Sequence, residues 1–227
     1  MKDKLLLRFA IRETIGTVIV GVLLFWPART LDWWPAWGVV AITFLWTLGT
    51  GIVIVRANPD LLAERLGPRK GGKAWDAAIM GVVGVITMGR LIVAGFDHYY
   101  GWTGEFPIGV QLAALMICVI AHALLVWATG SNAYFSQIMR IQTEREHAVA
   151  SGGPYRFVRH PGYVGSILND LALPILLSSW WAFLLGIINV ALFIARTALE
   201  DRDLKNELDG YKAYADRVRY RLLPGVW

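Results

Sequence analysis

The stretch Gly153-Pro154-Tyr155-Arg156-Phe157-Val158-Arg159-His160-Pro161-Gly162-Tyr163-Val164-Gly165 lies between two strongly apolar segments of the chain. It carries three basic side chains and the hydroxyl groups of two tyrosines. Further on, the stretch Arg196-Thr197-Ala198-Leu199-Glu200-Asp201 stands at the end of the last apolar segment. Ionisable groups beside membrane-spanning helices are costly and usually functional. The two stretches therefore predict a site for a small, charged molecule at one face of a membrane.

The composition indicates an integral membrane protein. Of the 227 residues, 56% are hydrophobic and 17% are charged, whereas soluble domains carry roughly 25% charged residues. The single cysteine, Cys118, excludes an internal disulfide and a cysteine metal cluster. The four histidines lack metal-ligand spacing, so we predict no metal site. The net charge of +5 fits membrane topology better than nucleic-acid binding, and we predict no nucleic-acid partner.

The hydropathy pattern predicts an all-α, polytopic membrane helix bundle of about five to six transmembrane helices. Its apolar segments cover residues 11–27, 35–55, 75–96, 108–129, 164–178 and 180–197. The first segment follows basic residues, and we interpret it as a transmembrane helix rather than a cleaved signal peptide. The last two segments are short and almost adjacent. They predict a C-terminal helical hairpin that is tilted or crosses the bilayer only in part.

Basic residues are distributed unevenly around these segments. Apart from Arg29 and Arg90, every Lys and Arg falls in the N-terminus, the loops 56–73 and 131–163, or the tail from residue 196. The positive-inside rule then places both termini and the active site in the cytoplasm. We predict a multi-pass protein of an inner or plasma membrane.

The C-terminal tail predicts a further element. Apolar residues recur at three- or four-residue spacing over 200–221, which is typical of an amphipathic helix. We expect this helix to lie on the cytoplasmic face, where it could close over the site. We divide the chain into N-terminal transmembrane helices, 1–130, and a cofactor-binding region with the hairpin and tail, 131–227.

Local patterns suggest how the two polar stretches could act. Arg196 and Glu200 share one face of a helix, either as a functional pair or as a helix-end pair in which Arg196 reaches the lipid headgroups. A residue before proline disfavours helical conformation, so Pro161 should begin a helix after His160. We expect the N–H groups of residues 162–164 to face a bound carboxylate or ribose oxygen. An ordinary helix start with basic residues near lipid phosphates is the alternative.

Four pieces of this sequence resemble the isoprenylcysteine carboxyl methyltransferase family, the integral membrane methyltransferases that use S-adenosylmethionine, and its phospholipid N-methyltransferase relatives. The pieces are Gly153-Pro154-Tyr155, Arg159 to Gly165, Arg196 with Glu200-Asp201, and Tyr211 to Pro224. The resemblance covers about residues 130–225. Where the family usually has a pair of glutamates, this chain has Glu200-Asp201.

The resemblance implies a role for each matching residue. Glu200 would hold the ammonium group of S-adenosylmethionine, and Arg196 would face the methyl acceptor as the catalytic and substrate-binding residue. Arg140 lies where some relatives have a cofactor-contacting glutamine, with Gln142 nearby. The remaining cofactor contacts would be an adenosine wall and a turn, made by His147, Ala148, Val149, Ala150 and Tyr155, and by His160, Pro161, Gly162 and Tyr163.

The function implied is methyl transfer to a membrane-associated or small hydrophobic acceptor, with an isoprenylcysteine-like carboxylate among the candidates. The lipid bilayer is the expected surrounding, and the acceptor atom (O, N or S) stays open. One alternative is an NADPH-dependent membrane sterol or enone reductase, because such enzymes share an arginine–histidine–aromatic turn and a tail like Arg219–Trp227. Another is a non-catalytic membrane scaffold, which leaves the clustered polar residues unexplained.

Overall fold

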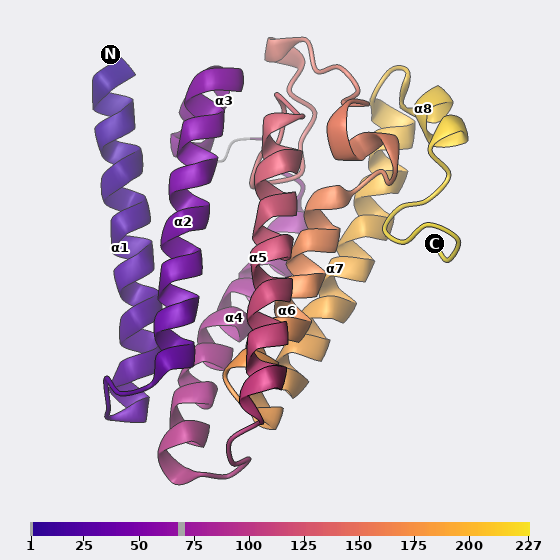
Figure 1. The fold of residues 1–227 in the computed structure, drawn as a ribbon. Helices are drawn as coiled ribbons and strands as arrows, with labels where there is room; N and C mark the ends of the chain where they lie inside the picture. The colour runs from indigo at the N-terminus through magenta and orange to yellow at the C-terminus, as the bar shows by residue number, and fades with distance from the viewer. Residues whose placement is uncertain (1, 68–70) are drawn as a thin grey trace.

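The computed structural model describes residues 2–67 and 71–227, and all regular structure within them is helical (Figure 1). This confirms the predicted all-α class. Two short 3₁₀ helices, η1 and η2, precede the hairpin. The elements in chain order are α1 (Lys2–Ala28), α2 (Trp34–Ala57), α3 (Asp60–Leu66), α4 (Ala74–Tyr100), α5 (Ile108–Gly130), η1 (Thr143–Arg145), η2 (Gly153–Arg156), α6 (Pro161–Leu176), α7 (Trp180–Glu207) and α8 (Tyr211–Arg217).

Helices α1, α2, α4, α5 and α7 are long and apolar enough to cross a membrane, which supports a multi-pass membrane protein. Their outward faces carry large apolar side chains, such as Leu45, Val85 and Ile120. Arginines and aspartates are instead found in the interior, for example Arg90 and Asp76. This distribution suits a protein that is surrounded by lipid hydrocarbon.

The hairpin formed by α6 and α7 confirms the sequence prediction. Helix α6 has 16 residues, so its length of about 24 Å is less than the hydrocarbon thickness of a bilayer, about 30 Å. Ser179 caps α7 by accepting a hydrogen bond from the Ala182 N–H at 3.1 Å. The second arm extends beyond the predicted end near residue 197, because α7 continues as one helix to Glu207. Arg196 lies just before this continuation and Glu200 lies within it.

Small residues let α6 approach its neighbours closely. A Cβ atom at Gly165 would lie 2.8 Å from the carbonyl oxygen of Ala121 in α5. A Cβ atom at Gly186 would clash with the carbonyl oxygen of Asp170, where α7 crosses α6. Close helix packing at glycine is the usual means of association in membranes. This close packing fixes the position of α6, the helix that begins with Pro161.

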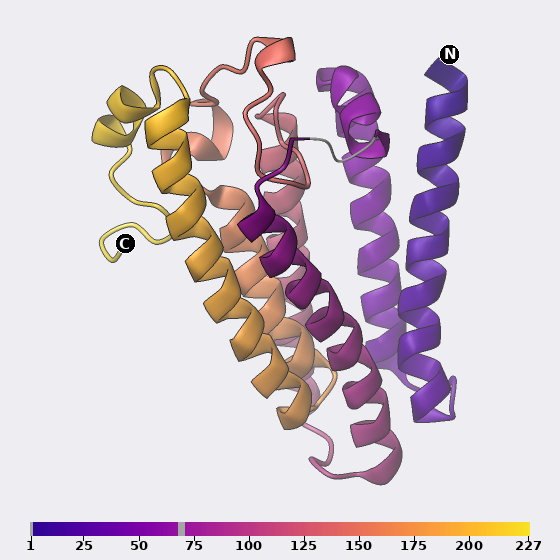
Figure 2. The same cartoon turned by 180° about the vertical axis from the view of Figure 1, so that it is seen from behind.

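One end of the bundle carries the N-terminus, α3, the loops between α5 and α6, and α8 (Figures 1 and 2). We call it the site end. The segments rich in Lys and Arg that the sequence places on one side of the membrane gather there. Arg69 and Lys70, two of the basic residues counted in that prediction, lie outside the described residues. The cytoplasmic orientation of this end stays a prediction.

The tail differs from the single amphipathic helix predicted over 200–221. Residues up to Glu207 continue α7, and a separate short helix, α8, ends at Arg217. Gly210 breaks the helix with a left-handed backbone angle, φ +79°. The apolar spacing reflects packing rather than a surface helix, because Tyr211 and Tyr214 are buried against the end of α5 and η2.

Candidate active site

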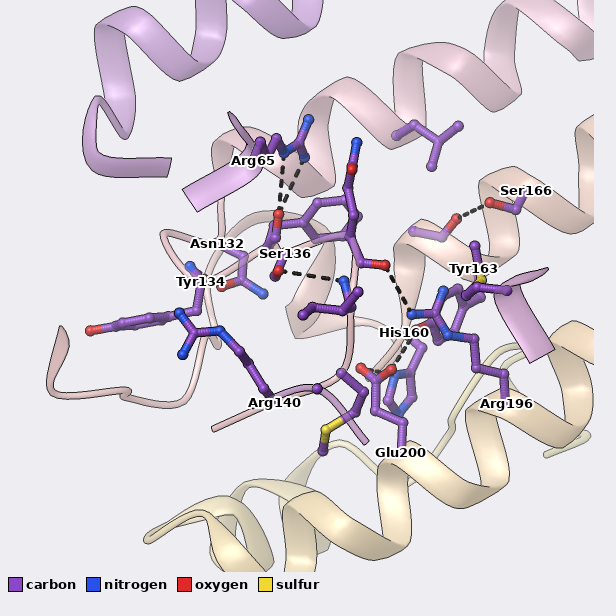
Figure 3. A pocket seen from close by; sticks show the side chains of 18 of the residues that line it. Arg65, Asn132, Tyr134, Ser136, Arg140, His160, Tyr163, Ser166, Arg196 and Glu200 are labelled. Carbon is purple, nitrogen blue, oxygen red and sulfur yellow. Dashed lines mark hydrogen bonds and ion pairs between the residues drawn. The ribbon is translucent and has the colours of Figure 1, made fainter. Parts of the chain in front are cut away.

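A large cavity of about 900 Å³ lies at the site end (Figure 3). Its polar lining comes mainly from the loop after α5, the start of α6 and the inner face of α7, and its apolar lining mainly from α4. Most of the predicted site residues line it, namely His147, Val149, Ala150, Tyr155, His160, Gly162, Tyr163, Arg196 and Glu200. The predicted contacts Ala148 and Pro161 do not line the cavity: Ala148 is exposed, and Pro161 is buried as the first residue of α6.

Arg196 is buried in the interior, with only 5% of its surface exposed. Its Nε donates a hydrogen bond to Asp76 Oδ1 at 2.7 Å, and its Nη2 donates to the carbonyl oxygen of Gln137 at 3.4 Å. The guanidinium also lies over the Tyr163 ring, 5.0 Å from its centroid. The alternative in which Arg196 reaches the lipid headgroups is therefore wrong.

Asp76 is a site residue that sequence reasoning missed. It is fully buried in the first turn of α4, where one carboxylate oxygen binds Arg196 and the other accepts the Met139 N–H at 2.7 Å. It thus joins α4, α7 and the loop that covers the cavity. Its position at the start of an apolar span was a signal, because an acidic residue there requires a partner.

Glu200 presents its carboxylate to the cavity beside two aromatic rings. It accepts a short hydrogen bond from the Tyr163 hydroxyl, and its Oε1 lies 3.7 Å from His160 Nδ1. The rings of His160 and Tyr163 are stacked with an interplanar angle of 8°. Among the described residues, no Lys or Arg lies within ion-pair distance of Glu200. Figure 3 shows Glu200 and Arg196 projecting from the same helix toward the cavity.

The neighbouring Asp201 has the opposite surroundings. Its carboxylate binds Arg159 through two hydrogen bonds of 2.6 and 3.0 Å, Arg221 at 2.9 Å and Lys205 at 3.1 Å. The Tyr211 hydroxyl donates to it as well, at 3.1 Å. Its acceptor positions are occupied by the protein's own groups, so Asp201 holds the structure around the site together rather than facing the cavity.

The turn before α6 is held by the C-terminal tail. The backbone N–H groups of Arg159 and His160 donate to the carbonyl oxygens of Tyr220 and Arg221, both at 3.0 Å. His160 has φ −127°, outside the helical region, and α6 begins at Pro161 as predicted. The expected row of open N–H groups is wrong at Tyr163 and Val164, because both donate to the His160 carbonyl oxygen. The helix start therefore closes on itself instead of facing a ligand.

An aromatic wall faces the cavity from the loop after α5. The His147 ring stacks on Tyr134 with centroids 4.3 Å apart, and His147 Nδ1 accepts the Gln142 N–H at 3.2 Å. Burial, with the nearby Arg145 and Arg140, lowers the pKa of His147 to about 4. The imidazole is therefore neutral near pH 7. Tyr134 lines the cavity but was not predicted.

The two residues considered for a cofactor contact near position 140 have different environments. Arg140 lines the cavity and pairs with Glu64 and Glu144, at 2.6 Å in each case. Gln142 is fully buried, and its amide donates to the Tyr134 carbonyl oxygen and accepts from Arg145. The side chain of Gln142 is thus used to shape the loop.

Arg65 is another cavity-lining cation that the sequence did not reveal. Its guanidinium donates to the Phe135 carbonyl oxygen at 3.3 Å and to the Thr129 hydroxyl at 3.4 Å. Burial, followed by the charge of Arg12, lowers the pKa of Arg65 to about 10. It is still a cation at neutral pH and gives the α3 side of the cavity a positive charge.

Residues 113–206 match the sequence model of the Isoprenylcysteine carboxyl methyltransferase (ICMT) family. The match runs from α5 through α7 and includes Arg196, Glu200 and the turn at His160. It supports a membrane methyltransferase in general and confirms the resemblance noted in the sequence. No curated protein matches the chain.

Proposed function

We propose that the protein binds S-adenosylmethionine in the large cavity and transfers the methyl group of this cofactor to a lipophilic acceptor. The observation that carries this proposal is the contrast between two neighbouring acids. The Glu200 carboxylate faces the cavity, with no Lys or Arg at ion-pair distance among the described residues. The Asp201 carboxylate is buried and neutralised by arginines. A carboxylate that lines a cavity is a strong partner for an ammonium group. The cofactor supplies that ammonium, and its sulfonium supplies an electrophilic methyl group.

The aromatic wall fits the rest of the cofactor. The stacked pair of His147 and Tyr134 offers a flat surface on the loop side of the cavity, and Tyr155 lines the same cavity. Because His147 is neutral near pH 7, it adds no positive charge beside a cationic sulfonium. Aromatic faces attract cations, which suits this arrangement. We therefore assign the adenosine side of the ligand to His147 and its neighbours Val149 and Ala150.

Arg196 is assigned to the acceptor. Its guanidinium is fixed by Asp76 and lies over Tyr163, which in turn donates its hydroxyl hydrogen to Glu200. The residue facing the acceptor and the residue facing the cofactor are thus held by one connected set of contacts. Methyl transfer is a displacement in which the new bond to the acceptor forms as the methyl–sulfur bond breaks. The main tasks of the chain are to align the two molecules and exclude water.

The acceptor would enter from the bilayer side. The cavity is lined by Gly81, Gly84, Val85 and Met88 of α4, together with Trp46 and polar threonines of α2. Val85 and Met88 are also exposed on the outer surface, by 73% and 55%. Helix α4 diverges from α1 and α2 toward the site end (Figure 2). Because Val85 and Met88 line the cavity and are also exposed, an apolar molecule could enter beside α4 while its reactive group reaches Arg196.

The C-terminal tail, Arg219–Trp227, is similar to that of membrane reductases, but its contacts do not support the reductase alternative. Its carbonyl oxygens accept from the turn at His160, its Arg221 binds Asp201, and the same guanidinium stacks on Trp227 at 4.7 Å. These residues are used within the protein. The arginines nearest to Glu200 in the cavity lining, Arg159 and Arg196, are paired with Asp201 and Asp76.

The test is calorimetric binding of S-adenosylhomocysteine and, separately, NADPH to the protein in nanodiscs. We expect saturable binding of S-adenosylhomocysteine and none of NADPH. Arg196→Met should lower the affinity for S-adenosylhomocysteine less than Glu200→Gln does, because Arg196 is assigned to the acceptor and reaches Glu200 only through Tyr163. Binding of NADPH alone would assign the site to the reductases, and binding of neither ligand would contradict an enzyme of either class.

A further inference from the structure

A second cavity, of about 180 Å³, lies deeper in the bundle than the large cavity. Trp46 lines both of them. On α5 the lining passes from Leu125 to His122, and on α6 from Ser166 to Asn169. Each step is three residues, which corresponds to about 4.5 Å along a helix. The second cavity therefore continues the apolar side of the large cavity toward the middle of the membrane. We call it the Arg90 pocket, after the arginine that lines it.

Arg90 is one of the two basic residues that lie outside the segments predicted to be cytoplasmic. It is 1% exposed, and its Nη1 donates to Asp170 Oδ1 at 2.5 Å and to the Asp170 carbonyl oxygen at 3.2 Å. The pair is neutral overall. A buried, hydrogen-bonded ion pair can join helices, and this one joins α4 to α6.

Joining helices does not account for every polar atom in the pocket. Arg90 Nε and Asn169 Oδ1 are both buried, and neither has a hydrogen-bond partner within the described residues. Both residues line the same pocket, whose other walls are mainly apolar, including Val39, Ile42 and Leu173. Leaving such groups unpaired inside a membrane is costly. One donor and one acceptor are therefore without a partner in the walls of a small, mostly apolar space.

We infer that the Arg90 pocket binds a neutral hydroxyl-type group carried on an apolar body. A hydroxyl group donates one hydrogen bond and accepts others, so it matches both kinds of unpartnered atom, the donor Arg90 Nε and the acceptor Asn169 Oδ1. A charged group does not fit, because the charge of Arg90 is already balanced by Asp170 and a further charge would be unpaired.

The size of the pocket suits the end of a ligand. At about 180 Å³ it is smaller than a site for a whole drug-sized molecule, roughly 300–1,000 Å³. Since it continues the large cavity, we assign it to the far end of the methyl acceptor. This assignment rests on the proposed function. It makes the acceptor a lipophilic molecule with a second, neutral, hydrogen-bonding group remote from the one that is methylated.

The test compares two probes of similar shape, cyclohexanol and methylcyclohexane, which differ in the hydroxyl group. Their apparent affinities are obtained from the ligand-dependent rise in the thermal midpoint of the protein in nanodiscs, with empty nanodiscs as the partitioning control. For the natural chain we expect cyclohexanol to bind about tenfold more tightly, as one net hydrogen bond would give. Asn169→Leu should bring the ratio to about one.

Thr50→Val is the matched control. The Thr50 hydroxyl is also buried without a partner within the described residues, but Thr50 does not line the pocket. This variant should keep the preference for cyclohexanol. Equal affinities of the two probes for the natural chain would overturn the inference, whether or not Asn169→Leu folds. Loss of the preference in Thr50→Val as well would also overturn it, because the effect would then be general.

Binding of S-adenosylhomocysteine to the same nanodiscs separates the two proposals. If S-adenosylhomocysteine binds but cyclohexanol is not preferred, the Arg90 pocket is rejected and the methyltransferase proposal stands. If cyclohexanol is preferred but S-adenosylhomocysteine does not bind, the methyltransferase proposal is rejected. The assignment of the pocket to a methyl acceptor is then rejected with it, although its chemistry is retained.

Discussion

Glu200 and Asp201 are neighbours in sequence, yet their carboxylates have opposite surroundings. Asp201 is fully buried and is bound by Arg159, Arg221 and Lys205. Glu200 is partly exposed to the large cavity and is bound by a tyrosine hydroxyl, with His160 nearby. The helix rotates by about 100° from one residue to the next, which directs one carboxylate into the protein and the other into the cavity. The comparison separates an acid that maintains the structure from an acid that is available to a ligand.

The largest effect should follow from removing the charge of Asp201. Asp201→Asn leaves the buried guanidinium of Arg159 without its counter-charge, and breaking a buried pair costs about 3–5 kcal/mol. We expect a large fall in the denaturation midpoint in detergent, as measured by circular dichroism. A stable Asp201→Asn variant that had lost only ligand binding would mean that Asp201, and not Glu200, faces the ligand.

A similar but smaller loss should follow at Asp76, whose partner is Arg196. Asp76→Asn should destabilise the fold by about 2–4 kcal/mol, because Arg196 then stays charged in the interior. In the double variant Asp76→Asn with Arg196→Met, part of this loss should be regained, with a coupling energy of about 1–3 kcal/mol. The check is a double-mutant cycle of denaturation midpoints. Strictly additive effects would show that the ion pair does not hold α4 to α7.

The pH dependence at His147 should give the smallest effect. Its pKa in the folded protein is about 4, below the unfolded value of about 6.5. The unfolded chain therefore binds more protons between these values, and the contribution of His147 to stability decreases as the pH falls from 6.5 to 4. In His147→Gln this part of the slope should be missing, while the slope due to Glu64 and Glu144 remains. Identical pH profiles of the denaturation midpoint would contradict a neutral, buried His147.

Much of the fold could be predicted from local patterns in the sequence. The spans, the hairpin and the helix that starts at Pro161 each follow from local patterns of apolar residues and proline. The tail prediction failed because apolar spacing does not show whether a stretch is one helix or two packed pieces. Gly210 was visible as a breaker in the sequence, but the burial of Tyr211 and Tyr214 depends on packing against α5.

The candidate site was predictable only where its residues are close in the sequence or belong to the family pattern. Glu200, His160 and Tyr163 met both conditions. Asp76, Tyr134 and Arg65 come from segments that the fold brings to the cavity, and no periodicity in the sequence states which helices pack together. The structure also shows that ion pairs between Asp76 and Arg196 and between Glu64 and Arg140 cross the division at residue 130. That division stays a prediction.

The most direct test of the account is the affinity of S-adenosylhomocysteine for Glu200→Gln, with Glu207→Gln as the matched control on the same helix. Glu207 pairs with Lys73 at 2.6 Å and lies outside the cavity lining. We predict that Glu200→Gln weakens binding by about 10- to 100-fold, as loss of a charged hydrogen bond would, with a nearly unchanged denaturation midpoint. Glu207→Gln should bind as the natural chain does. Equal affinity in the natural chain and in Glu200→Gln would contradict the assignment of the open carboxylate to the cofactor.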